Sequence, residues 1–149
     1  MEIHLLDSAK QEIYRESTQQ YPNKVFGFLY GKQGKYRELN LARTVSADDT
    51  AANDTYFITA RHYLEAEEFA EQHKLQLLGV FISHPDHMPI PSESDIRRAL
   101  PFFSYIIVSV KKGKIIALKS WQLNNGRFEE ESLKIEYDHV DLEKLLEQN

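Results

Sequence analysis

A histidine and an aspartate that could bind a metal ion flank a proline-containing loop. The sequence from Gly79 to Asp95 reads GVFISHPDHMPIPSESD, with His84 at the end of an apolar run and Asp95 three positions after Ser92. Imidazole nitrogen and carboxylate oxygen are both ordinary zinc ligands. A serine followed by acidic residues is typical of the start of a helix. The pattern therefore predicts a strand, a loop and a helix, with a potential metal ligand on each side of the loop.

This segment resembles the signature of the JAMM/MPN family of zinc metallopeptidases. In that family the strand ends in His-x-His-Pro, the helix opens with Ser-x-x-Asp, and both histidines and the aspartate bind zinc. His84 falls on the second histidine, Pro85 on the proline, and Ser92 and Asp95 on the serine and aspartate. Residues two apart on a strand share a face, and the first histidine position is occupied by Ile82. The resemblance therefore implies two remnant zinc ligands, His84 and Asp95.

A second family element lies upstream, where a glutamate three residues before a glycine acts as base on the zinc-bound water. The corresponding sequence is PNKVFGFLYG, and Lys24 stands three residues before Gly27. Ser92 falls on the residue whose hydroxyl stabilises the oxyanion in the family, although a helix cap explains this serine equally well. The catalytic positions that the resemblance assigns are therefore Ser92 and Lys24.

These two departures bear directly on metal binding. A catalytic zinc usually takes three protein ligands and keeps one position open for water, whereas His84 and Asp95 supply only two. Lys24 brings a positive charge to the place of a base. We expect no cofactor, with zinc as the metal if any binds. We also expect Lys24 to become the counter-charge of Asp95, because a buried carboxylate without a partner is unfavourable.

Two alternatives remain open. A rearranged zinc site could use His84 and Asp95 with His87, which follows in the same loop, and with Glu93. Such a site would make the chain an active metallopeptidase or isopeptidase. Alternatively, the chain could be an interaction domain that uses only its outer surface, such as the acidic helix face around Glu65 and Glu68.

Short segments with the apolar patterns of strands and of helices must position these residues. Apolar runs too short for helices are typical of buried strands, and apolar residues at helical spacing from Ala60 to Lys74 predict an amphipathic helix. Asp7 and Ser8 are candidate caps of an earlier helix. We expect strands at 25–30, 36–44, 56–59, 75–83, 102–110, 114–123 and 127–136, helices at 7–20, 60–74, 92–100 and 141–148, and an exposed loop at 46–54.

Bulk properties limit the function classes. The 149 residues suit one domain, 1–149, and no low-complexity linker divides them. A net charge of −5 with dispersed lysine and arginine disfavours a nucleic-acid partner. No run is long and apolar enough for a membrane span or leader, and cysteine is absent, so we expect a cytoplasmic protein that does not bind membranes.

Together these observations predict an α/β (α+β) fold of the MPN/JAMM-like, cytidine-deaminase-like type, a curved mixed sheet flanked by helices. The resemblance implies partners of protein or peptide nature, such as the tail of a ubiquitin-like or sulfur-carrier protein. With one ligand and the base replaced, we expect a non-catalytic binding domain in which a tail adds as a strand to a sheet edge.

Overall fold

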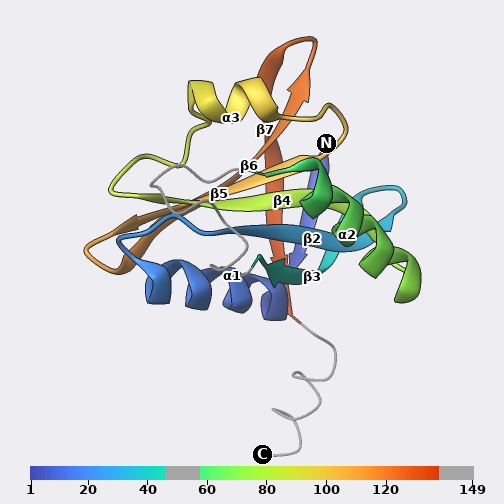
Figure 1. The fold of residues 1–149 in the computed structure, drawn as a ribbon, viewed down its shortest axis with the longest axis horizontal. Coiled ribbons are helices and arrows are strands. Elements are labelled where there is room, and N and C mark those ends of the chain that lie inside the picture. The colour runs from blue at the N-terminus through green and yellow to red at the C-terminus, as the bar shows by residue number, and fades with distance from the viewer. Residues whose placement is uncertain (46–57, 138–149) are drawn as a thin grey trace, which may run out of the picture.

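Strands and helices alternate along the residues that the structure describes, 1–45 and 58–137, in a computed structural model (Figure 1). The strands are β1 (Glu2–Leu6), β2 (Phe26–Gln33), β3 (Arg37–Thr44), β4 (Gln76–Pro85), β5 (Ser104–Lys111), β6 (Lys114–Asn124) and β7 (Arg127–Glu136). The helices are α1 (Asp7–Gln20), α2 (Ala60–Gln72) and α3 (Glu93–Arg98).

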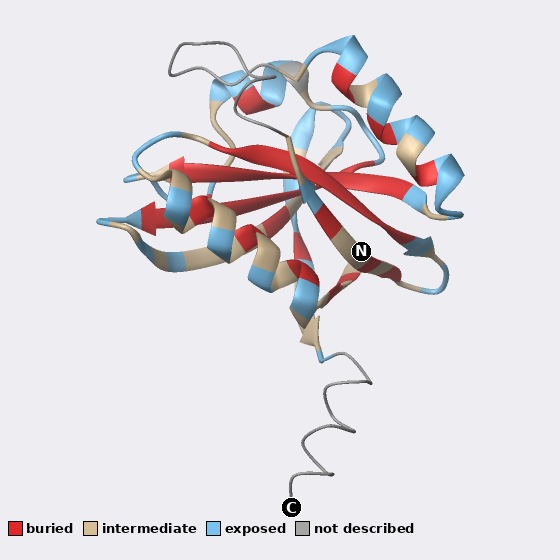
Figure 2. Ribbon diagram, turned by 60° about the horizontal axis from the view of Figure 1, so that its bottom comes forward, coloured by how far each residue is buried: buried red, intermediate tan, exposed pale blue. Residues whose placement is uncertain are grey.

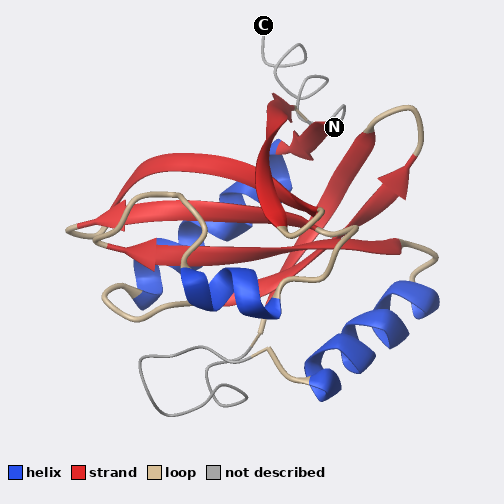
Figure 3. Ribbon diagram, turned by 90° about the horizontal axis from the view of Figure 1, so that it is seen from above, coloured by secondary structure: helices blue, strands red, loops and turns tan. Residues whose placement is uncertain are grey.

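The strands form one curved sheet of mixed direction that closes on itself (Figure 3). Their order is β1-β3-β2-β4-β5-β6-β7, and β7 returns to pair with β1. The pairs β1/β3, β1/β7 and β4/β5 are parallel, and the other neighbours are antiparallel. The predicted curved mixed sheet with flanking helices is confirmed. Closure is an additional finding: each described strand has a neighbour on both sides, so none is an edge strand to which a tail could add in the expected way.

Two apolar cores lie on opposite faces of the central strands β2, β4 and β5 (Figure 2). On one face, Ala9 and Ile13 of α1 pack against Phe81 and other buried side chains of the barrel. On the other face, Ala66 and Ala70 of α2 pack over the aromatic residues of β2 and β5. Burial on both sides explains why these strands read as continuous apolar runs in the sequence.

Gly27 allows β2 to lie close to its neighbours. A Cβ atom at this position would stand 2.2 Å from the backbone oxygen of Arg43 and 2.3 Å from the ring of Phe81. Neither group can move without shifting strand β3 or the barrel core. The glycine in the motif around Lys24 therefore has a packing role that any larger side chain would disrupt.

A polar cluster lies within one part of the barrel. Arg37 is only 1% exposed, and its guanidinium donates hydrogen bonds to the backbone oxygens of Leu78 (3.1 Å) and Phe102 (2.7 Å) and to Ser104 Oγ (2.9 Å). It also interacts electrostatically with the buried carboxyl group of Glu131. Arg37 thereby links β3 to β4 and to the segment that precedes β5.

Most predicted elements appear within a few residues of their expected limits, with two differences. Helix α1 begins at Asp7, but Leu6 occupies the N-cap position and no side chain caps the helix, so Asp7 and Ser8 are not its caps. Residues 58 and 59 are not in a strand, because Thr59 caps α2 instead. The rest of the predicted strand 56–59, the loop 46–54 and the helix 141–148 lie outside the described residues. Among the described helices, none has the length and apolar character needed to cross a bilayer.

Candidate functional site

Strand β4 places Ile82 and His84 on the same face of the sheet, as their spacing predicts. Ile82 is 1% exposed and belongs to the apolar core under α2, together with Phe26, with which it is paired across β2 and β4. His84 follows at the end of the strand, where apolar packing gives way to polar partners. The first ligand position of the motif is thus part of the core, and the second remains polar.

Both ring nitrogens of His84 contact oxygen atoms. Nδ1 lies 2.9 Å from the backbone oxygen of Met88, and Nε2 lies 3.1 Å from Oδ2 of Asp95. Because a carbonyl oxygen only accepts, the tautomer with hydrogen on Nδ1 donates to Met88, and Nε2 faces the carboxylate oxygen of Asp95. The ring is 4% exposed, so these contacts fix its orientation. A ring nitrogen bound to a backbone carbonyl is also the usual support of a metal-binding histidine.

Helix α3 begins with a reciprocal cap that holds Asp95. The hydroxyl oxygen of Ser92 accepts a hydrogen bond from Asp95 N (3.2 Å), and Ser92 N donates to Asp95 Oδ2 (2.8 Å). The same carboxylate oxygen contacts His84, and Asp95 is 4% exposed. The predicted cap at Ser92 is confirmed. Asp95 therefore joins the start of α3 to the end of β4, across the loop 86–92 that connects the two elements.

Lys24 reaches the site from the segment that leads into β2. Its neighbour Val25 is fixed against β4, because Ser83 Oγ accepts from Val25 N (2.8 Å) and Ser83 N donates to Val25 O (2.9 Å). Burial lowers the pKa of Lys24, and the nearby charge of Asp95 acts in the opposite direction. The charges of Lys24 and Asp95 therefore interact, and Asp95 also contacts His84.

The donor set can be compared with what a catalytic zinc requires. Two ligands about 2.0–2.1 Å from a tetrahedral zinc lie roughly 3.3 Å apart, close to the 3.1 Å between His84 Nε2 and Asp95 Oδ2. A third protein ligand is needed, and within 1–45 and 58–137 no three His, Cys, Asp or Glu side chains come together in a way that could hold a metal. The described residues therefore do not fit a catalytic zinc.

His87 and Glu93, the residues proposed for a rearranged site, lie elsewhere. The side chain of Glu93 is 90% exposed, and the guanidinium of Arg97 lies 3.8 Å from its carboxylate. His87 is exposed, and its backbone oxygen accepts a hydrogen bond from Ser109 Oγ (2.5 Å). The described geometry does not assemble these two residues with His84 and Asp95.

Several supporting residues escape sequence reasoning. Ser83 aligns the Lys24 segment with β4, and its only signal is a polar residue inside an apolar strand. Tyr105 is 3% exposed, and its hydroxyl accepts from Leu100 N (2.7 Å) just beyond α3. Trp121 Nε1 donates to the backbone oxygen of Pro89 (3.0 Å) and thereby holds the loop before the helix. The spacing of Tyr105 and Trp121 along the sequence gives no link to the segment 84–95. They lie near it only because β5 pairs with β4 and β6 pairs with β5.

A closed mixed barrel with a strand that ends in His-Pro and a serine-capped helix bearing aspartate defines a domain of the JAB/MPN class. A family model described as prokaryotic homologs of the JAB domain matches residues 6–124, and the chain belongs to this family. The match reaches beyond the motif through strand β6.

Solved structures agree with this assignment. The solution structure of protein DSY2949 from Desulfitobacterium hafniense is similar with a TM-score of 0.77 and 25% identity, over 91% of this chain and 94% of that one. A solution structure of a protein from Salinibacter ruber has a TM-score of 0.70 and 27% identity, over 91% and 92% of the two chains. A search of curated proteins finds no match.

Proposed function

We propose that this chain is a non-catalytic member of the JAB family, a single domain that binds a protein or peptide without hydrolysing it. The observation that carries the proposal is the direct contact between His84 and Asp95 beside Lys24, with Ile82 buried in the apolar core. In this arrangement the Lys24 ammonium and the imidazole of His84 face the carboxylate of Asp95 in place of a divalent ion. Ser92 acts as a helix cap, and Lys24 stands at the position of the family's catalytic glutamate.

The partner that best suits a silent domain of this family is the C-terminal tail of a ubiquitin-like or sulfur-carrier protein. Because the barrel has no described edge strand, such a tail would bind through side chains and loops around Lys24 and the segment 86–92. The positive charge of Lys24 favours an anionic group, such as the terminal carboxylate of the tail.

Metal analysis tests the loss of the zinc site. Protein purified without chelator should contain far less than one zinc per chain. Retention of near-stoichiometric zinc would overturn the proposal, whatever the behaviour of any variant.

The double substitution Lys24→Glu and Ile82→His tests the assignment of positions. Because His84 and Asp95 already stand at a spacing that suits zinc, the double variant should bind zinc in a dialysis assay, whereas Lys24→Glu alone should not. A folded double variant that binds no zinc would show that these positions do not correspond to the family's ligand and base.

Binding of a tail is tested by calorimetric titration with a ubiquitin-like protein of the sulfur-carrier type. Lys24→Ala should weaken binding, and Lys32→Ala, which removes an exposed lysine of β2, should not. Equal affinity of both variants and the unmodified chain would instead favour an interaction through the outer surface.

A further inference from the structure

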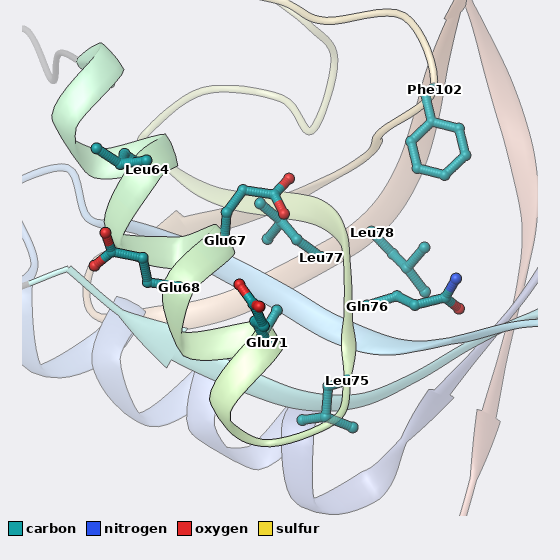
Figure 4. A pocket seen from close by; sticks show the side chains of 10 residues that line it. Leu64, Glu67, Glu68, Glu71, Leu75, Gln76, Leu77, Leu78 and Phe102 are labelled. Atoms are coloured by element: carbon teal, nitrogen blue, oxygen red, sulfur yellow. The ribbon is translucent and has the colours of Figure 1, made fainter.

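A groove separates α2 from the first residues of β4, away from the residues of the candidate site (Figure 4). Its volume is about 490 Å³, within the range of sites that receive ligand groups. Helix α2 forms one wall, the beginning of β4 forms the floor, and Phe102 stands on the far side. The residues on which the argument depends are Leu64, Glu67, Glu68, Glu71, Leu77 and Phe102.

The groove leaves large apolar side chains in contact with water. Leu64 is 60% exposed on α2, and Phe102 is 55% exposed across from it. Leu77 of the floor is buried, so the apolar surface continues from the two exposed side chains into the core. Exposed apolar surface that lines a concavity is typical of a docking site, whereas scattered single residues are not.

The charged side chains that line this groove are all negative. Glu67, Glu68 and Glu71 line it, and no lysine or arginine does. Within the part of the chain that the structure describes, none of these three carboxylates forms an ion pair. In contrast, Glu65 on the same helix lies 3.5 Å from Arg61. Glu71 also stands one helical turn from both Glu67 and Glu68, so the carboxylates repel one another.

We propose that this groove docks a segment of a partner protein that presents an apolar side chain between lysine or arginine residues. The apolar side chain would cover Leu77 between Leu64 and Phe102, and the flanking cations would neutralise the glutamates of α2. Because the groove shares no residue with Lys24, Ile82, His84, Ser92 or Asp95, the inference does not rest on the proposed function.

The test uses the full chain labelled with ¹⁵N and a short synthetic peptide of leucine and lysine, with the leucines on one helical face. The peptide should shift the amide resonances of α2, the start of β4 and Phe102. A peptide in which glutamate replaces each lysine should cause no such shifts. Added salt should weaken binding of the lysine peptide, because part of the attraction is between exposed charges.

Charge reversal provides a matched pair of variants. Glu67→Lys with Glu71→Lys should weaken binding by at least about tenfold, through repulsion in place of attraction. Glu129→Lys with Glu130→Lys makes the same change in net charge on β7, outside the groove, and should change the affinity by less than about twofold. Leu64→Ala should also weaken binding, which separates apolar docking from simple attraction of charges.

Three outcomes would overturn the proposal. Equal losses in the two charge-reversed variants would mean that the peptide responds only to net charge. Resonance shifts centred on another surface would place the peptide elsewhere. Shifts at the groove that appear on concentrating the chain alone would identify a second copy of this chain as the occupant. All substituted residues except Leu64 are exposed charged groups, and a well-dispersed spectrum of each variant establishes that it is folded.

Discussion

The carboxylate of Asp95 has two structural partners at once. It closes the cap of α3 through Ser92 and contacts the imidazole of His84 at the end of β4. Both contacts are buried, and Lys24 adds a third, electrostatic interaction. The side chain of Asp95 thus contributes to the fold of this chain by joining α3 to β4.

Replacement of Asp95 should therefore lower the stability of the folded chain. Asp95→Asn keeps the size of the side chain but removes the charge that Lys24 and His84 face, so we expect a loss of about 2–4 kcal/mol in the free energy of unfolding. Chemical denaturation with urea measures this loss. Glu93→Gln, in the same turn of α3 but exposed, should have little effect; similar losses in both variants would show that the charge of α3 as a whole matters.

Sequence reasoning was informative about some residues of this site and silent about others. The pairing of His84, Ser92 and Asp95 follows from local spacing, because a strand, a short loop and a helix cap restrict where they can lie. The electrostatic interaction of Lys24 with Asp95 follows from their opposite charges. Ser83 and Tyr105 were missed because their roles depend on the register of β2 against β4 and on the position of β5 beneath α3, which no local pattern specifies.

Among the elements, β2 is closely packed at Gly27. Its neighbours β3 and β4 pair with it on both sides, and Gly27 fits between the backbone of Arg43 and the ring of Phe81. Lys24 lies just before the first residue of β2, so the position of β2 determines the position of the lysine.

Gly27→Ala should displace β2 or the Phe81 ring, because its methyl group would overlap both neighbours. We expect a loss of at least about 2 kcal/mol in stability, at the upper end of what overpacking produces. Thermal unfolding monitored by circular dichroism measures it. Gly34→Ala is the matched control, since the nearest atom to its Cβ would lie 4.0 Å away; a comparable loss there would mean that chain flexibility, not space, is responsible.

Element types were largely predictable, because period and turn residues determine them locally. The hairpin turn at Asn125 and Gly126 is an example: both residues have positive φ, of 53° and 80°, as such a turn requires. Strand β1 was visible only as a short apolar stretch. Its role depends on parallel pairing with β3 and β7, and β7 lies at the opposite end of the described chain.

For the molecule as a whole, barrel closure encloses ionisable groups that would otherwise be hydrated. Glu131 is 4% exposed, Ser120 Oγ donates to its Oε1 (2.8 Å), and its Oε2 has no hydrogen-bond partner among the described residues. Burial raises the pKa of this carboxyl group above its ordinary value, against the opposing effects of Ser120, Ser104 and Arg37. The folded barrel therefore holds the Glu131 proton more tightly than the unfolded chain does.

This shift gives stability a defined dependence on pH. A raised pKa in the folded state favours folding below the ordinary pKa of glutamate, and that contribution is lost as pH rises through the folded pKa. Glu131→Gln removes the titration of this group. As pH rises from about 4 to 7, the unfolding temperature of the variant should therefore increase relative to that of the unmodified chain. Thermal unfolding across this range measures the difference. A constant difference at every pH would contradict the assignment, and Glu130→Gln, which is exposed, serves as control.

The buried guanidinium of Arg37 has a consequence for binding thermodynamics. It holds the backbone oxygen of Phe102 at 2.7 Å and lies 4.7 Å from the centre of the Phe102 ring, so the far wall of the groove beside α2 is tied to the barrel. Because that wall is already ordered in the folded chain, docking of a partner costs less conformational entropy than docking on a mobile loop would. Calorimetry of the leucine and lysine peptide should then show a negative heat-capacity change from apolar burial, without the large entropic penalty of ordering a loop.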